Sequence, residues 1–384
     1  MSSFSELWAE IAPIGRADSG GYLRFALTEP ELTLRDWFRA QASVRDMTVT
    51  EDGNGNLFAW RGEPWAPGTV LTGSHFDSVP HGGGYDGPLG IVSAFLAIDA
   101  VPHDRKIGIA AFVEEEGGRF GVPCLGSRLL TGAIDPSRAA ALKDRDGITF
   151  GEALGAIPSG QIVQVGQLRA VVELHIEQGI ALETPVGVAS AIWPHGRWRM
   201  DFTGVGDHAG TTRMADRHDP MLTFAFTVLA ANKEARLAGG HATVGRVQVE
   251  PNATNAIPSL VRGWLDARAA DTATLDRMVD EVVRKATERA GRDGTSLAVT
   301  PESVTPEVAF DVPLADRLSK VLNDAPILPT GAGHDAGVLS GHVPTAMLFV
   351  RNPTGVSHSP AEHASDADCE AGVEALATVL TDLS

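Results

Sequence analysis

The sequence predicts an α/β fold: a domain built on a mostly parallel central sheet, into which a smaller α+β domain is inserted. Two observations support this prediction. Apolar runs that polar residues do not interrupt indicate strands buried on both faces, as in parallel sheets. Between two stretches of that kind, residues 195–304 show half-exposed strands and capped helices instead. We therefore expect one domain from residues 1–194 and 305–384 and a second from residues 195–304.

Four apolar runs are the expected strands of the larger domain, and one helix lies between the first two. The strands cover residues 70–74, 107–113, 170–174 and 345–350. The helix covers residues 88–100, because a proline in its first turn is followed by a largely apolar stretch. Alternation of such strands with helices is typical of a parallel sheet covered by helices.

Residues 195–304 contain the elements of a ferredoxin-like domain, in the order β-α-β-β-α-β. Residues 198–202 alternate as a half-exposed strand does. Asp219, followed by proline, starts one helix, and Asp271 can cap a second helix that ends at Gly291. The remaining expected strands are residues 242–249, 260–267 and 296–299.

The chain is acidic: 31 Lys and Arg residues against 49 Asp and Glu residues give a formal charge of −18. This charge argues against binding to nucleic acid or to an anionic membrane. No apolar run reaches the ~18 residues of a membrane span, and the first residues lack the pattern of a signal peptide. Two cysteines, Cys124 and Cys369, are too few for a disulfide framework. We expect a cytoplasmic globular protein.

Histidines and carboxylates stand at the ends of the four expected strands. His75 and Asp77 follow the first strand, three glutamates at 114–116 follow the second, His175 closes the third and His358 follows the fourth. In open α/β sheets, ligands bind beyond the carboxyl ends of the strands. These side chains are therefore expected to meet at one site.

The residue types at these strand ends favour a metal site. Three adjacent carboxylates at a buried strand end repel one another and raise each other's pKa, and a cation removes that cost. The alternative is a solvated acidic turn. Asp86 ends the glycine-rich loop 81–87, and it is either a helix cap or a carboxylate carried back toward His75, where it can bridge two metal ions.

Six motifs together resemble one family, the amidase, hydantoinase and carbamoylase branch of the M20 metallopeptidase clan. They begin at Gly73 (GSHFDSV), Gly84 (GYDGPLG), Glu114 (EEEGGRF), Glu173 (ELHIEQG), Asp207 (DHAGTT) and Ser357 (SHSPAE). The resemblance covers roughly residues 54–362 and implies an α/β catalytic domain with an inserted lid and dimerisation domain. It also implies a homodimer formed through that insertion.

The resemblance implies two divalent metal ions in each subunit, and Zn, Mn, Co and Ni all suit the mixed histidine and carboxylate set. The implied ligands are His75, Asp86, Glu116, His175 and His358. Asp86 would bridge the two ions. Asp77 would orient the ring of His75, and Glu115, which is not itself a ligand, would be the general base.

The resemblance also implies residues that hold the substrate. On the inserted domain, His208 matches a histidine that typically reaches the site of the partner subunit, while Asn255 and Arg268 match residues that bind a carboxylate. Gln178 matches a residue near the ureido group. Without the resemblance, His208 reads as a turn histidine and Arg268 as half of a surface ion pair.

The implied reaction is hydrolysis of the carbamoyl C–N bond of a small ureido carboxylate, with release of ammonia and CO2. We expect allantoate as the substrate, because residues 193–198 and 350–355 look most like bacterial allantoate amidohydrolases. Arg351 and Asn352 are the expected donors to its second ureido group. The alternatives are an N-carbamoyl-L-amino acid, an acyl-amino acid or peptide, and a binding protein that keeps the fold without catalysis.

Overall fold

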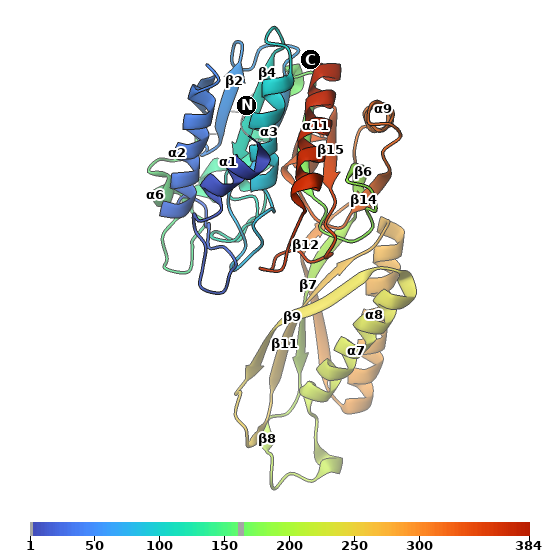
Figure 1. Cartoon of the computed structure of the whole chain (residues 1–384). Helices are drawn as coiled ribbons and strands as arrows, with labels where there is room; N and C mark the ends of the chain where they lie inside the picture. The colour runs from blue at the N-terminus through green and yellow to red at the C-terminus, as the bar shows by residue number, and fades with distance from the viewer. Residues whose placement is uncertain (1–2, 160–164) are drawn as a thin grey trace. The chain divides into compact units, whose positions relative to one another are not determined.

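A computed structural model describes residues 3–159 and 165–384 of the chain. It contains two compact units (Figure 1). The first is formed by Met1–Ile192 and Ala309–Ser384, and the second by Trp193–Val308. The chain therefore leaves the first unit once, builds the second from one continuous segment, and returns.

A nine-stranded sheet forms the centre of the first unit, in the order β1-β2-β4-β3-β5-β15-β6-β13, with β14 paired to β6. The strands are β1 (Thr48–Glu51), β2 (Leu57–Arg61), β3 (Val70–His75), β4 (Ile107–Phe112), β5 (Ala170–Ile176), β6 (Val186–Ile192), β13 (Val308–Ala309), β14 (Ile327–Thr330) and β15 (Thr345–Val350). The four adjacent strands β4, β3, β5 and β15 run parallel. They are the four strands predicted from the apolar runs, so the mostly parallel sheet is confirmed.

Helices cover both faces of this sheet, which explains why every residue of β3, β4, β5 and β15 is buried. Apolar residues of five helices pack on one face: α1 (Phe4–Ile11), α2 (Glu29–Ser43), α3 (Pro88–Ala100), α9 (Val312–Val321) and α11 (Asp366–Leu383). The strand residues that point the other way contact α4 (Leu125–Thr131) and α10 (Asp335–Leu339). The short helices α5 (Pro136–Ala140) and α6 (Phe150–Leu154) and the 3-10 turn at Val165–Gln167 complete this unit.

The second unit has the predicted ferredoxin-like order, β7-α7-β9-β11-α8-β12. Its antiparallel sheet has the strand order β12-β7-β11-β9, and α7 and α8 lie side by side on one face of it (Figure 1). The elements are β7 (His195–Thr203), α7 (Pro220–Ala238), β9 (His241–Glu250), β11 (Leu260–Arg268), α8 (Thr272–Asp293) and β12 (Ser296–Thr305). A separate two-stranded sheet joins β8 (Asp207–His208) to β10 (Ala256–Ile257), and a 3-10 turn covers Met214–Asp216.

The caps of the two long helices follow the sequence with one correction. The carboxylates of Asp219 and Asp271 accept from main-chain N–H groups of their first turns, as predicted. The predicted end of α8 at Gly291 is wrong, because that glycine lies inside the helix. The helix continues to Gly294, whose φ of +69° gives the left-handed conformation that ends it.

The parallel strands of the first unit carry the expected side chains to one edge of the sheet. Since β3, β4, β5 and β15 run in the same direction, their carboxyl ends lie next to one another. Within the described ranges 3–159 and 165–384, no helix is long and apolar enough to cross a membrane.

Candidate metal centre

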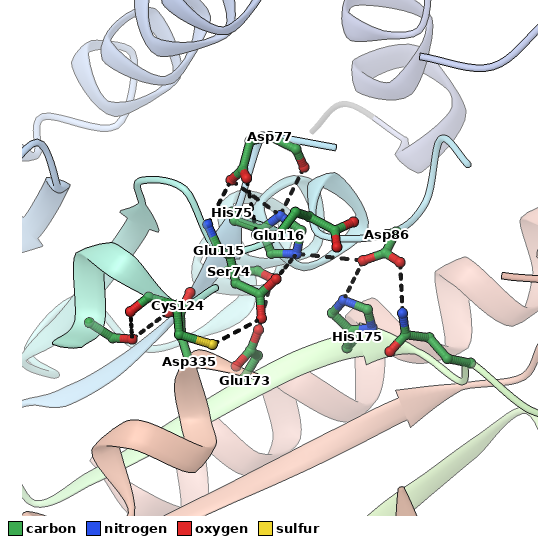
Figure 2. Close-up of polar contacts among 12 residues, drawn as sticks. Ser74, His75, Asp77, Asp86, Glu115, Glu116, Cys124, Glu173, His175 and Asp335 are labelled. Atoms are coloured by element: carbon green, nitrogen blue, oxygen red, sulfur yellow. Dashed lines mark hydrogen bonds and ion pairs between the residues drawn. The ribbon is translucent and has the colours of Figure 1, made fainter. Parts of the chain in front are cut away.

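His75, Asp86 and His175 form one compact group of potential metal ligands (Figure 2). His75 ends β3, His175 lies near the end of β5, and Asp86 comes from the loop that leads into α3. Asp86 Oδ1 lies 3.1 Å from Nε2 of His175 and 3.5 Å from Nε2 of His75. All three residues are buried, so these polar atoms are out of reach of bulk water.

Asp86, Glu116 and His358 form a second group. The Nε2 atom of His358 lies 3.3 Å from Asp86 Oδ2 and 3.4 Å from Glu116 Oε2. Asp86 therefore belongs to both groups, and it faces each of them with a different carboxylate oxygen. The helix cap before α3 is Gly87, and the Asp86 side chain makes no capping hydrogen bond, so the helix-cap alternative for Asp86 is wrong.

The imidazole rings are set up to bind a cation. Nδ1 of His75 lies 3.0 Å from the main-chain carbonyl of Asp77, and Nδ1 of His175 lies 2.8 Å from that of Ile176. A carbonyl only accepts, so each Nδ1 carries a proton, and in the neutral form of the ring the Nε2 lone pair faces Asp86. Both Nε2 atoms are buried without a hydrogen-bond partner among the described residues. Two lone pairs facing a carboxylate need a cation between them, so these residues fit a metal ion.

The electrostatics of the cluster point the same way. Burial alone would raise the pKa of Asp86, but the nearby rings of His175, His358 and His75 hold it well below its usual range. Burial and the charge of Asp86 raise the pKa of Glu116 to about 7. Burial would lower the pKa of His75, but the carboxylates of Glu115, Asp86 and Asp77 raise it well above its usual value. Carboxylates and histidines so close together take up protons unless a metal ion replaces them.

Asp77 contacts His75 differently from the expectation. The main-chain oxygen of Asp77 accepts the hydrogen bond from His75 Nδ1. The carboxylate oxygen Oδ1 of Asp77 lies 3.6 Å from the same nitrogen. The carboxylate instead accepts from the main-chain N–H groups of Glu115 and Glu116, at 3.1 Å each. Asp77 thus contacts the ring through its main chain and the two glutamates through its side chain.

The three consecutive glutamates have three different surroundings. Glu114 is turned away from the ligand groups, and its carboxylate accepts from the main-chain N–H groups of Arg119 and Phe120. Glu116 belongs to the second ligand group. Glu115 belongs to neither group, although its Oε2 lies 3.7 Å from Nε2 of His75 and only 5% of the residue is exposed. Its Oε1 accepts from the Cys124 thiol at 3.5 Å, and its Oε2 faces the site without being a part of either ligand set.

Gln178 lies at the second group of ligands. Its Nε2 donates to Asp86 Oδ2 at 2.8 Å and to Ser357 Oγ at 3.1 Å. Its Oε1 is buried and has no hydrogen-bond partner in the described part of the chain. An unpaired buried acceptor of this kind is available to an N–H group of a bound molecule.

The expected role of Arg351 and Asn352 does not agree with the structure. Two guanidinium nitrogens of Arg351, Nε and Nη2, donate to the carboxylate of Asp368 at 3.0 to 3.3 Å. Asn352 is 1% exposed. Its side-chain N–H donates to the main-chain oxygen of Val356, and its side-chain oxygen accepts from the main-chain N–H of Thr354. These groups are held by their own fold and are not presented to a second ureido group.

Several buried residues next to the ligands were assigned no role from the sequence. The ring centroids of His334 and His175 lie 4.5 Å apart. Burial, and to a smaller extent the charge of His175, lower the pKa of His334 well below its usual value. Asp335 accepts from Ser127, and burial and the nearby Glu173 raise its pKa well above the usual range. The remaining two are Cys124 and Glu362. The only signal in the sequence is the run Gly-His-Asp-Ala-Gly at the start of α10, which is also typical of an ordinary helix start.

The second unit brings His208 and Asn255 together. Both line an open pocket of about 560 Å³ at the β8–β10 sheet. Nδ1 of His208 accepts from the main-chain N–H groups of Gly210 and Thr211, at 3.0 and 3.2 Å. The proton of the neutral ring is therefore on Nε2, which makes His208 a hydrogen-bond donor toward a ligand.

Arg268 does not lie with these two residues. It ends β11 and is paired with His195, whereas Leu260, at the other end of the strand, is paired with Thr203. Strand β8, which carries His208, follows Thr203 in the chain and lies at that end of the sheet (Figure 1). Since β11 has nine residues, its two ends are roughly 26 Å apart. Nε of Arg268 donates to Asp266 at 3.1 Å. Within one copy of this unit, a small ligand cannot contact Arg268 and His208 at once.

The chain is similar to known amidohydrolases over nearly its whole length. The model of peptidase family M20/M25/M40 matches residues 71–382. The N-carbamoyl-L-amino acid amidohydrolase of Geobacillus stearothermophilus is 34% identical, over 98% of this chain and 97% of that protein. The allantoate amidohydrolase of Escherichia coli is 30% identical, over 97% and 96%. A crystal structure of a hydantoinase/carbamoylase family amidase from Burkholderia multivorans superimposes with a TM-score of 0.86 at 32% identity, covering 99% of this chain and 98% of that one.

Proposed function

The chain belongs to peptidase family M20/M25/M40, and we propose that it hydrolyses the carbamoyl C–N bond of a small carboxylate that carries a ureido group. One observation carries this proposal. Both carboxylate oxygens of Asp86 lie close to histidine Nε2 atoms, and the carboxylate of Glu115, which belongs to neither ligand group, lies beside them. This is the arrangement that metal-assisted hydrolysis needs: two ligand sets that share a carboxylate, with a separate base.

We propose that His75 and His175 hold one divalent ion, that Glu116 and His358 hold the other, and that Asp86 serves both. Such ions lower the pKa of water and polarise a carbonyl oxygen when they are bound. The part of Glu115 is to take a proton from the attacking water and give it to the leaving nitrogen. His208 donates from Nε2 to the carbonyl oxygen as negative charge develops on it. Gln178 Oε1 accepts from a ureido N–H, and Asn255 and Arg268 bind the carboxylate.

The distance between His208 and Arg268 supports a homodimer in which two copies complete each site. A small ureido carboxylate is much shorter than the roughly 26 Å between the ends of β11. His208 and Arg268 of one copy would therefore contribute to two different substrate sites. The second unit also offers a surface for a second copy. Strand β9 is an edge of its sheet, and α7 exposes three leucines at helical spacing: Leu222, Leu229 and Leu237.

A mixing experiment tests the contribution of His208 in trans. Glu115→Ala and His208→Ala are each expected to be inactive alone. After subunit exchange, half of the dimers are mixed and each has one site with both residues intact, so about one quarter of the wild-type activity should return. Exchange is verified by native mass spectrometry of differently tagged chains. If mixed dimers form and remain inactive, His208 does not act on the partner's site.

Two observations favour an N-carbamoyl-L-amino acid over allantoate as the substrate. The donors expected for the second ureido group of allantoate, Arg351 and Asn352, are engaged within their own fold. Ile180, two residues after Gln178, is 71% exposed and lies against Gly355. An exposed apolar side chain so near Gln178 in the sequence suits the side chain of an amino acid better than a polar second ureido group.

Ammonia release with a panel of substrates tests this order. We expect kcat/KM for N-carbamoyl-L-methionine to exceed that for allantoate at least about tenfold, since a matched apolar side chain contributes that much discrimination. N-carbamoyl-β-alanine is the control for the side chain. N-acetyl-L-methionine is the control for the ureido group, and its cleavage, which yields no ammonia, is followed by the release of methionine. A higher kcat/KM for allantoate would restore the substrate predicted from the sequence. Absence of turnover with the whole panel, in metal-loaded protein, would favour a binding protein.

A further inference from the structure

Glu362 holds the loop that carries Asp86. Its Oε1 accepts from two consecutive main-chain N–H groups, that of Tyr85 at 2.9 Å and that of Asp86 at 3.0 Å. Only 5% of the residue is exposed, and its second oxygen has no hydrogen-bond partner among the residues described. A buried carboxylate in such a position contributes more than an exposed one, because water does not compete for the same N–H groups.

The loop is shaped to receive this carboxylate. Gly83 lies so close to Glu362 that a Cβ atom at this position would collide with its carboxyl group. On the other side, Tyr85 stacks on Trp8 with ring centroids 4.7 Å apart and meets His363 edge-on at 6.0 Å. The glycine admits the carboxylate and the aromatic rings hold the loop against it, so the main chain of Asp86 has little freedom.

Glu362 also connects two parts of the site that are far apart in the sequence. It comes four residues after His358, so one short segment supplies a potential ligand and the support for the carboxylate shared by both ligand groups. Residues 85 and 86 are linked to this segment by hydrogen bonds that span more than 270 positions of the chain. The position of Asp86 relative to His358 therefore depends on Glu362.

We infer that Glu362 is a positioning residue: by accepting from the main-chain N–H of Asp86, it fixes the shared carboxylate between the two groups of ligands. The inference rests on the proposed metal centre. Residues that orient a ligand typically change metal affinity 10- to 100-fold when they are replaced.

The test is calorimetric titration of metal-free protein with Zn²⁺, compared with thermal unfolding of the same metal-free samples. Glu362→Ala is expected to weaken Zn²⁺ binding about 10- to 100-fold, and Glu362→Gln, which keeps an acceptor oxygen, by less than about tenfold. Asp144→Ala is the matched control. One oxygen of Asp144 also accepts from two main-chain N–H groups, those of Asp146 and Ile148, but it contacts no ligand candidate. Its replacement should leave the affinity unchanged.

Gly83→Ala gives a second, independent variant, in which the Glu362 carboxylate is present but displaced. Gly83→Ala should weaken Zn²⁺ binding as Glu362→Ala does. If Glu362→Ala fails to fold, the Zn²⁺ affinities of Gly83→Ala and Glu362→Gln test the role of Glu362. Wild-type affinity in these variants, even with lowered thermal stability, would overturn the inference and leave Glu362 a purely structural residue. If wild-type protein itself binds no Zn²⁺, Mn²⁺, Co²⁺ or Ni²⁺, the proposed metal centre is what fails.

Discussion

Asp86→Asn is expected to empty both metal positions and to lower kcat/KM by at least about 10³-fold. The substitution removes the one carboxylate whose two oxygens face both ligand groups, at 3.1 Å from His175 and 3.3 Å from His358. An amide offers a single neutral oxygen and turns an N–H₂ group toward one of the histidines. Loss of metal assistance is worth several kcal/mol of transition-state stabilisation, and each 1.36 kcal/mol is a factor of ten in rate.

The measurement is metal content per chain by mass spectrometry after incubation with excess Zn²⁺, together with kcat/KM. Asp52→Asn is the matched control, because Asp52 is also a buried aspartate of the first unit, but its carboxylate is bound to Asn54 and Asn56. We expect this control to retain about two ions per chain. Two ions per chain in Asp86→Asn, or full activity of the wild-type protein in the presence of a strong chelator, would contradict a centre built on Asp86.

The order of the strands explains why the place of most ligand candidates could be predicted from the sequence. A strand buried on both faces leaves a long apolar run, and the first polar residue after it lies at the edge of the sheet. His75 ends β3, His175 is the last residue but one of β5, and Glu116 is the third of the glutamates that come shortly after β4. The rule therefore predicts where these residues lie, whereas the resemblance singles them out as ligands. The rule does not apply to Asp86, because its place depends on the path of a loop, and there the resemblance to a known family supplied what periodicity could not.

The residues that surround the ligands could not be predicted in this way. Glu362 reaches Asp86 from a segment 276 positions away, and Ser127 meets Asp335 across 208 positions. Nothing in the local sequence distinguishes such a carboxylate from a surface one, since burial and partners are properties of the folded chain. For the same reason, Arg351 looked available to a substrate, although it is bound to Asp368 at the start of α11.

The fold of the second unit was easier to predict than the roles of its residues. Amphipathic strands and capped helices repeat with fixed periods, and the order β-α-β-β-α-β follows from them. The sequence does not say that His208 and Arg268 lie at opposite ends of this unit. Their separation depends on the antiparallel register of β11 with β7, and it is this register that suggests two copies of the chain for each site.

Glu115→Gln is expected to lower kcat by about 10³-fold while the protein keeps its metal ions, because a general base contributes a factor of about 10² to 10⁴. The amide has nearly the same shape as the carboxylate but cannot take up a proton. Glu115 lies outside both ligand groups, with its Oε1 3.5 Å from the Cys124 thiol and its Oε2 3.7 Å from His75. KM should therefore change by less than about tenfold, since the loss is confined to proton transfer.

The neighbouring glutamate makes this prediction specific. Glu114→Gln is the same chemical change one residue earlier, but Glu114 accepts from the main chain of Arg119 and Phe120 and does not face the ligands. We expect it to affect the free energy of unfolding more than kcat, since it alters a buried group that accepts two main-chain hydrogen bonds. If Glu115→Gln and Glu114→Gln lower kcat by similar factors, or if Glu115→Gln loses its metal, the base is not Glu115. A metal-loaded Glu115→Gln protein with a much reduced kcat and a nearly unchanged KM leaves proton transfer as the step that this carboxylate performs.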